Sequence, residues 1–437
     1  MALRNKFALS IRLAEGVQKK HLRVYLLVAF FSTCMMAFIN FIQPYLLTEY
    51  LNIKTENQGR VAGNLVFWNE IVIILLVSIV GVLSDKLGRA SIYGFGFIVM
   101  SIAYVLFPYA TSLTELTSIR VFFAIGAACV AAMLATVMAD YPKDEHRGKL
   151  TGVVGVMTGL GIMLIVFVLA KLPFWYQNLE VSAKQAGHYS FLTVAGICLF
   201  VGVVAIFGLK KGAVKGASSK KSFKELAREG LQAGKNPKIA LAYASSFVSR
   251  GDLAIVGTFL SLWVIQDGLA RGLESAEALK QAGMIFGISQ GAALLWAPVI
   301  GVICDKTSRV KAVAIALFLA FVGYVSLGFV KEANSVYMIV ACVFVGIGEI
   351  SGVIASQALI GEQAPKSCRG SVIGLFGLFG AIGILLATKV GGYLFDAIHP
   401  SAPFVAIGIV NGAVFLMALA TMAGESSAFM KQAAQDA

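Results

Sequence analysis

The sequence predicts an all-α polytopic membrane protein with twelve transmembrane helices in two six-helix halves, and two observations lead to this fold class. Hydrophobic residues make up 58% of the 437 residues and charged residues only 14%, whereas ordinary soluble domains have about 25% charged residues. A soluble domain has no interior for so much apolar surface. The apolar residues also form twelve runs of about 20 residues, the length at which a helix crosses the hydrocarbon core.

These twelve runs follow one another with short connections, except for one longer basic stretch. The spans are predicted near residues 24–47, 61–83, 90–111, 115–139, 150–171, 190–209, 239–265, 282–303, 310–330, 335–358, 370–395 and 402–423. We interpret the basic stretch as a solvated connector, with contact to lipid headgroups as an alternative. The predicted domains are an N-terminal bundle at 1–209, this cytoplasmic linker at 210–238 and a C-terminal bundle at 239–437.

Charge asymmetry predicts the orientation in the membrane. With the N-terminus in the cytoplasm, the cytoplasmic segments hold 26 Lys and Arg residues and the outer loops hold 7. This bias follows the positive-inside rule. We therefore expect a multi-pass, monomeric protein of the plasma membrane, the inner membrane of a bacterium, with both termini cytoplasmic. The same asymmetry explains the net charge of +13, so that charge is no argument for nucleic acid as a partner.

Two internal repeats relate the halves. "RGKLTGVVGVMTGLGIML" from Arg147 aligns with "RGSVIGLFGLFGAIGILL" from Arg369, and "GVLSDKLGRA" aligns with "GVICDKTSRV". The two sets occur in the same order, which indicates duplication. Parallel repeats of six spans suit an alternating-access transporter whose site lies near the midplane between the halves.

Here the residues resemble the major facilitator superfamily. Its signature between spans two and three is matched by Gly81, Asp85, Gly88 and Arg89, with a decayed second copy at Gly301, Asp305 and Arg309. "RVFFAIGAA" from Arg120 is similar to the family's fourth-span motif. The fifth span lacks the glycine–proline pair usual in the family's drug/proton antiporters, which favours symport over antiport.

The resemblance implies a cytoplasmic gate. Asp85 would approach the start of span eleven near Ser371, where free N–H groups favour an anion, and would hold the cytoplasmic side shut. Arg89 would brace this contact against Asp140, and Asp305 would act likewise toward span five. Ordinary loop chemistry is the alternative. The predicted gating residues are Gly81, Asp85, Gly88, Arg89, Asp140, Arg147, Asp305, Arg309, Glu362, Arg369 and Lys389.

Charges inside the predicted spans mark the candidate transport site. Each costs about 2.5–3.5 kcal/mol at a helix centre, so each needs a partner or a wet cavity. The resemblance implies that spans one, four, seven and ten line a central cavity, and these spans carry most of the intramembrane polar residues. The predicted substrate- and proton-binding residues are Arg250, Asp252, Glu349, Asn40, Gln43, Glu70, Arg120 and Gln357.

Arg250 and Asp252 lie two residues apart, which means about 200° of rotation on a helix. They cannot simply pair on a regular helix, so we expect one to face the cavity and the other to find a partner on a neighbouring span. The favoured arrangement places Arg250 near Glu349 or bound substrate, with Asp252 titrating. The alternative is a buried network that only orients helices.

Three further charges have two interpretations each. Glu70 and Lys389 would form an outer latch that closes in the inward-facing state, or Glu70 would itself be the proton site. Arg120 would support proton coupling as a cation beside a carboxylate, or would have a structural hydrogen-bonding role.

The predicted function is a secondary active transporter that moves a small organic solute by alternating access, with proton-coupled symport favoured. Buried Glu70, Asp252 and Glu349 are candidate proton carriers, and an arginine in the cavity favours an anionic or zwitterionic carboxylate. The alternatives are a proton-coupled exporter of drugs or amphiphiles, an uncoupled uniporter, and a sensor that has lost transport. No enzyme, metal site or cofactor is predicted, because the sequence has no ATP-binding loop, metal-ligand cluster or nucleophile elbow.

Overall fold

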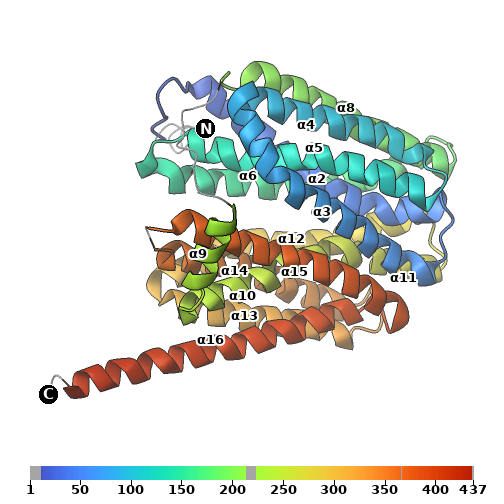
Figure 1. Ribbon diagram of the computed structural model, residues 1–437. Helices are drawn as coiled ribbons and strands as arrows, with labels where there is room; N and C mark the ends of the chain where they lie inside the picture. The colour runs from blue at the N-terminus through green and yellow to red at the C-terminus, as the bar shows by residue number, and fades with distance from the viewer. Residues whose placement is uncertain (1–10, 213–222, 366, 436–437) are drawn as a thin grey trace, which may run out of the picture. The chain divides into compact units, whose positions relative to one another are not determined.

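The computed structural model describes residues 11–212, 223–365 and 367–435, and Figure 1 shows a chain built of helices. Within these residues, twelve helices are long and apolar enough to cross a membrane. The predicted all-α, multi-pass fold with twelve spans is therefore confirmed. Residues 213–222 of the predicted linker lie outside the described part of the chain.

The first six spans are long helices, and capping side chains mark the starts of the fourth and the sixth. They are α2 (Lys19–Glu49), α3 (Thr55–Leu87), α4 (Arg89–Leu106), α5 (Leu113–Asp140), α6 (Arg147–Phe167) and α8 (Ala183–Gly208). The connections contain η1 (Phe107–Tyr109), η2 (Asp144–His146), η3 (Leu169–Lys171) and α7 (Leu172–Gln177). Ser112 accepts a hydrogen bond from the Glu115 N–H, and Ser182 forms a reciprocal capping box with Gln185. Such caps satisfy N–H groups that a helix start leaves without partners.

The last six spans begin after the amphipathic helix α9 (Phe223–Ala233). The seventh span consists of α10 (Pro237–Ile255), the π-helical turn η4 (Val256–Leu260) and α11 (Ser261–Ala270). The remaining elements are α12 (Ser275–Lys306), α13 (Arg309–Ser326), η5 (Leu327–Phe329), α14 (Val336–Gln363), α15 (Arg369–Ala397) and α16 (Ala402–Gln435). Asn236 caps α10, and Pro237 occupies its first position, where no N–H is needed.

The chain divides into two compact units. Unit 1 comprises Met1–Thr55, Leu65–Ala217 and Gly268–Gly283, and unit 2 comprises Glu56–Asn64, Ser218–Asp267 and Met284–Ala437. Two short stretches belong to the unit made mainly of the other half of the sequence. The start of α3 belongs to unit 2, and the start of α12 belongs to unit 1.

The duplication seen in the sequence recurs in the helix packing. In unit 1, α4 packs on α5 and α8, and α2 packs on α6 and α8; in unit 2, α13 packs on α14 and α16, and α10 packs on α15 and α16. When the spans are numbered from the start of each half, the same pairs of spans contact each other in both units. Small residues bring the backbones close: a Cβ on Gly348 would lie 2.5 Å from the Ala320 Cα. Such contacts replace the hydrophobic drive that lipid cannot supply between helices.

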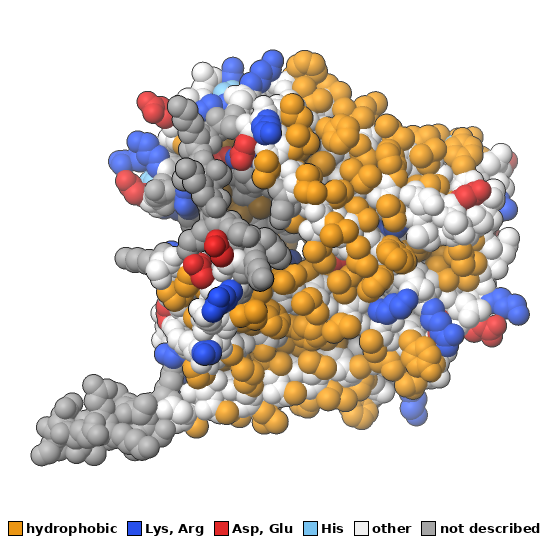
Figure 2. All heavy atoms as spheres, in the orientation of Figure 1, with side chains coloured by type: hydrophobic (Ala, Val, Ile, Leu, Met, Phe, Trp, Pro, Cys, Tyr) orange, Lys and Arg blue, Asp and Glu red, His pale blue; other side chains and the backbone are white. Residues whose placement is uncertain are grey.

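The outer faces of the helices are apolar. Figure 2 shows hydrophobic side chains spread over helix surfaces of both units. Leu75 of α3, Leu295 of α12 and Leu416 of α16 are 64%, 80% and 64% exposed, respectively. Contiguous apolar surface of this extent is rare on soluble monomers, whereas lipid tails cover it readily.

Candidate transport site and gating contacts

The two charges of the seventh span point in different directions. Arg250 is exposed, whereas Asp252 is 0% exposed. The stem of Arg250 lies against α15 at Gly380, where an added Cβ would be 2.7 Å from the Arg250 Cγ. The regular turn of α10 thus separates the charges, so Arg250 is the one of the two that can meet a solute.

Asp252 belongs to a buried polar cluster inside unit 2. Asn411 of α16 donates from Nδ2 to Asp252 Oδ1 at 2.8 Å and to the Ile407 carbonyl at 3.1 Å. Within the described residues, Asp252 Oδ2 and the hydroxyl of Tyr324 have no hydrogen-bond partner. Tyr324 of α13 lies within electrostatic range of both Asp252 and Glu349. Titration of Asp252 stays a prediction.

Glu349 of α14 is also buried, at 3% exposure. Gln290 of α12 donates from Nε2 toward both of its carboxylate oxygens, at 3.3 and 3.5 Å. The carboxylate of Glu349 is therefore held by a neutral amide, as that of Asp252 is.

A small cavity in unit 2 brings together two of the predicted residues. Its lining is Ser246, Ser249, Arg250, Val353, Ser356, Gln357 and Phe376. Arg250 and Gln357 are the predicted members. The three serines were not predicted, although the run of hydroxyls along α10 was a usable signal.

In unit 1, two other predicted residues pair. Arg120 of α5 is 1% exposed, and its Nη2 donates to Asn40 Oδ1 of α2. Its guanidinium lies 5.4 Å from the centre of the Phe123 ring. In the described part of the chain, its Nε and Nη1 have no hydrogen-bond acceptor. Gln43 is buried one turn beyond Asn40.

The signature loop forms a charge cluster in unit 1. Arg89 contacts Asp85 at 2.7 Å and Asp140 at 3.1 Å, and it also donates to the Ser84 hydroxyl. Gly88 has a φ of +91°, a conformation that favours glycine, whereas an added Cβ at Gly81 would meet open space.

The duplicate in unit 2 has the same arrangement. Arg309 contacts Asp305 at 3.2 Å and Glu362 at 3.3 Å. Arg369, at the start of α15, donates to the Gly361 carbonyl at 3.1 Å, and Arg147 begins α6 at the equivalent position. The predicted gating roles of both clusters stay predictions.

At the start of α15, the Ser371 hydroxyl donates to Glu229 of α9 at 2.9 Å. Tyr243 of α10 donates to the Gly230 carbonyl at 3.0 Å, which ties the same helix to unit 2. At the start of α15, where the sequence predicts the carboxylate of Asp85, the structure has the carboxylate of Glu229 from the linker helix α9.

A second contact in unit 2 joins the start of α3 to α15. Asp396, whose side chain is 1% exposed, accepts hydrogen bonds from the N–H groups of Gly59 and Arg60 at 2.8 and 2.7 Å. Lys389 donates to Asn64 Oδ1. The helices touch through glycine, because a Cβ on Gly392 would lie 2.6 Å from the Gly59 carbonyl oxygen.

This contact shares only Lys389 with the predicted latch of Glu70 and Lys389. Asp396 and Asn64 were not predicted. Glu70 lies farther along α3, in the stretch assigned to unit 1, and its part in a latch or as a proton site stays a prediction.

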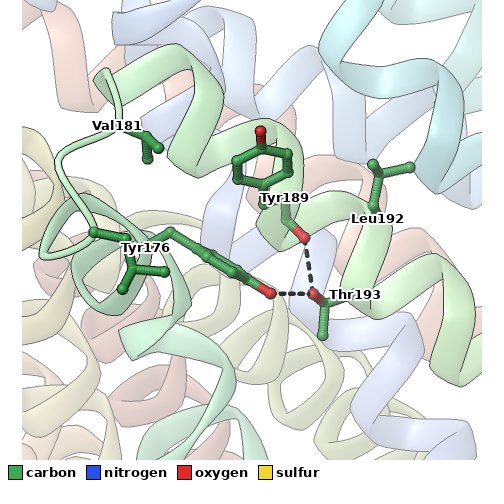
Figure 3. A pocket seen from close by; sticks show the side chains of 6 residues that line it. Tyr176, Val181, Tyr189, Leu192 and Thr193 are labelled. Carbon is green, nitrogen blue, oxygen red and sulfur yellow. Dashed lines mark hydrogen bonds between the residues drawn. The ribbon is translucent and has the colours of Figure 1, made fainter.

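A shallow pocket in unit 1 contains none of the predicted residues. Its lining is Tyr176, Leu179, Val181, Tyr189, Leu192 and Thr193. Figure 3 shows a hydrogen bond between the hydroxyls of Tyr176 and Thr193. The Thr193 hydroxyl also donates to the backbone carbonyl of Tyr189 at 2.8 Å. The described lining carries no charged side chain, so this pocket is not taken as the transport site.

Comparison with protein families and known proteins agrees with the fold. The family model described as Major Facilitator Superfamily matches residues 25–388 and 281–434. The magnetosome protein MamH of Paramagnetospirillum magneticum is 29% identical, over 94% of this chain and 95% of the relative. MamZ of the same organism is 28% identical, over 88% of this chain and 60% of MamZ, so the chain spans about three fifths of that relative. The synaptic vesicular amine transporter of Rattus norvegicus is 24% identical over 83% of this chain and 66% of the relative.

Solved structures of transporters share the architecture. The nucleoside transporter NupG has a TM-score of 0.69 at 13% identity, covering 93% of this chain and 99% of NupG. A POT family transporter in complex with a peptide conjugate has a TM-score of 0.68 at 16% identity, covering 96% and 99% of the two chains. At these identities the likeness is one of fold alone.

Proposed function

Because the chain belongs to the Major Facilitator Superfamily, we propose that it is a secondary active transporter that moves a small organic solute across the membrane by alternating access, in symport with protons. The observation that carries this proposal is the division of charge in unit 2. Arg250 and Gln357 line one cavity, while Asp252 and Glu349 are buried beside neutral amides. A solute and a proton thus have separate candidate sites in one bundle.

The cavity favours an anionic or zwitterionic solute. Among the described residues its lining contains a guanidinium and no carboxylate, and a cation attracts a carboxylate through opposite charge. We expect a carboxylate group of the solute to lie beside Arg250.

Proton coupling is assigned to the buried carboxylates. An ionised carboxylate in a protein interior needs full compensation by charges or hydrogen bonds, and Asp252 has one oxygen without a donor in the described chain. Proton uptake there would remove the uncompensated charge. Glu70 and Arg120 remain candidates for a part in coupling, on the sequence grounds given above.

Amine transport is the second candidate function. The relatives named as synaptic vesicular amine transporters align over most of this chain, and two buried carboxylates are suitable partners for an ammonium group. The two candidates predict opposite charge for the solute, so a single competition series separates them.

Transport in proteoliposomes tests the proposal. Purified protein should accumulate a radiolabelled carboxylate when the outside is made acidic, and a protonophore should abolish the accumulation. Downhill flux that does not depend on the pH gradient would indicate an uncoupled uniporter. Accumulation of amines under an inside-acidic gradient would support amine transport, the second candidate. Absence of any flux for solutes that bind the protein would contradict the transporter function itself.

We assign the outer gate to the contact of α3 with α15. Alternating access requires that contacts on one side open as those on the other close. Gln58 is 0% exposed beside this contact, so a Gln58→Cys variant should react slowly with a membrane-impermeant maleimide. Asp396→Ala or Lys389→Ala should raise its labelling severalfold, because each removes hydrogen bonds that hold α3.

The matched control for the gate is Lys331→Ala, which removes an exposed lysine of unit 2 and should leave the labelling unchanged. Equal labelling in all variants would remove the gate assignment without affecting the transport proposal. The plasma-membrane location with both termini cytoplasmic is tested separately, by protease protection of a tag at each end.

A further inference from the structure

The segment that precedes the first span pairs with the connection between α5 and η2. Residues 12–16 of this segment are called the strap below, and Leu13 of the strap forms an isolated antiparallel bridge with Pro142. Two backbone hydrogen bonds of 2.9 Å accompany the bridge, from the Ala14 N–H to the Tyr141 carbonyl and from the Lys143 N–H to the Arg12 carbonyl. Backbone groups thus bind the strap to this connection as they bind neighbouring antiparallel strands.

The strap ends in a turn that receives a lysine of the linker. Gly16 has a φ of +74°, a conformation that favours glycine. Lys210, shortly after the end of α8, donates from Nζ to the Glu15 carbonyl at 2.9 Å. A Cβ on Gly16 would lie 2.9 Å from the same Nζ. Both the backbone conformation and the close approach of the lysine therefore call for glycine at this position.

Tyr141 joins the strap to the linker a second time. It directly follows α5 and is 2% exposed. Its carbonyl accepts from the strap, and its hydroxyl accepts from the Lys210 N–H at 3.0 Å. Its ring lies 5.5 Å from the ring of Tyr25 in α2, measured between ring centres. Lys210 is therefore bound to the strap through its side chain and to Tyr141 through its backbone.

These contacts adjoin the charge cluster of the signature loop. Asp140, the residue before Tyr141, accepts from Arg89 Nε at 3.1 Å. Gly88, the residue before Arg89, lies close to the linker, because a Cβ on Gly88 would be 3.3 Å from the Gly212 nitrogen. All of these residues belong to unit 1. Both members of the Arg89–Asp140 contact are thus next in sequence to a residue that the first linker residues touch.

We propose that the strap and Lys210 position the Arg89–Asp140 contact, and that movement of the linker reaches this contact through them. The linker is the covalent connection between two halves that move relative to each other during alternating access. While Lys210 is bound to the strap and to Tyr141, a displacement of the linker acts on Tyr141 and so on the adjoining Asp140. The transmission of movement rests on the proposed transport function, because alternating access is what displaces the linker.

Hydrogen–deuterium exchange of the purified protein tests the docking of the strap without any solute. Lys210→Met keeps the apolar stem and removes the amine. Lys211→Met is the matched control, because it removes the same charge from the next residue, which is exposed. Amide groups bonded in the bridge exchange when the bridge opens. Exchange in segments 12–17 and 141–146 should be severalfold faster in Lys210→Met than in the wild type, and unchanged in Lys211→Met.

Gly16→Ala is a second, independent variant for the same measurement. Its methyl group would displace the Lys210 amine, and its backbone would be strained at the observed φ, so it should also accelerate exchange in both segments. Exchange at the wild-type rate in Lys210→Met and in Gly16→Ala overturns the docking of the strap.

A double-mutant cycle separates positioning from general stability. Tm is measured for the wild type, Lys210→Met, Asp140→Asn and the double variant. If Lys210 positions Asp140, the loss of Tm caused by Lys210→Met should be about half as large, or smaller, in the Asp140→Asn background, because residues of one network are not additive. The same cycle with Lys211→Met should be additive, which controls for the change in net charge. Additive effects in both cycles overturn the positioning role.

Flux in proteoliposomes tests the transmission of movement. Exchange of solute across the membrane should be severalfold slower in Lys210→Met than in Lys211→Met. Equal flux in the two variants overturns the transmission. Absence of flux in every protein, the wild type included, contradicts the proposed transport function and the transmission with it, whereas the docking and the positioning are still decided by hydrogen exchange and by Tm.

Discussion

Each unit buries one charged side chain against the carboxamide of an asparagine, but the two units use opposite charges and opposite ends of the amide. In unit 1 the guanidinium of Arg120 donates to the oxygen of Asn40. In unit 2 the nitrogen of Asn411 donates to the carboxylate of Asp252. A guanidinium keeps its proton throughout the physiological range, whereas a carboxylate can bind one. We therefore propose that unit 1 holds a permanent charge and that the buried carboxylate of unit 2 exchanges a proton.

The largest expected effect comes from removing the exchangeable charge. Asp252→Asn keeps a side chain of the same shape that can still accept from Asn411, but it cannot exchange a proton. Accumulation driven by a pH gradient should fall at least tenfold, while exchange of labelled for unlabelled solute across the membrane continues. Normal gradient-driven accumulation would break the comparison and make Asp252 a structural residue.

Removing the permanent charge should have a different effect. Arg120→Gln leaves a hydrogen-bonding side chain beside Asn40 and removes two buried nitrogens, Nε and Nη1, that lack acceptors in the described chain. We expect accumulation to stay coupled to pH, with a severalfold change in rate. Loss of coupling in this variant, measured as solute uptake with and without a proton gradient, would show that both units take part in it.

The duplicated charge clusters allow a second comparison of the two units, with a smaller expected effect. Arg89 has a side chain 10% exposed between two carboxylates, while its counterpart Arg309 is 26% exposed. Ion pairs contribute more when partly buried than when exposed, where about 0–1 kcal/mol is usual. Arg89→Ala should therefore lower Tm more than Arg309→Ala does. The reverse order would indicate that the decayed copy in unit 2 carries the stronger contact.

The smallest effect is expected at Tyr324. Its hydroxyl has no hydrogen-bond partner in the part of the chain that the structure describes, so Tyr324→Phe removes no bond seen there. The free energy of unfolding should change by less than about 0.5 kcal/mol, or rise, because a buried polar group without a partner is itself unfavourable. A large loss of stability or of pH coupling would mean that this phenol shares a proton with Asp252 or Glu349.

The sequence predicted the fold and the loop clusters better than the buried partners. Twelve apolar runs and an aligned repeat suffice for the architecture, and Arg89 with Asp140 lies next to a motif that occurs twice. Asn411 and Tyr324 are single polar residues in long apolar runs, and nothing in their spacing marks them. Helices that are apolar on most sides also carry no periodicity that fixes which face meets which neighbour.

The contact of α3 with α15 illustrates a second reason. The prediction that Lys389 would lie near span two rested on the family resemblance, which implies that spans two and eleven face each other. Predicting Asn64 and Asp396 as members of the contact required the depth of each side chain along its helix, and span boundaries read from hydropathy carry errors of several residues. One helical turn of error replaces every partner in such a contact.

The π-helical turn η4 follows Asp252 within one turn of the seventh span. Such a turn contains one residue more than α-helical bonding requires. If that surplus residue migrates along the span, the segment it passes rotates by about 100° about its own axis and advances by about 1.5 Å. The α10 part of this span, with Arg250, would then rotate and advance together while α11 stays in place.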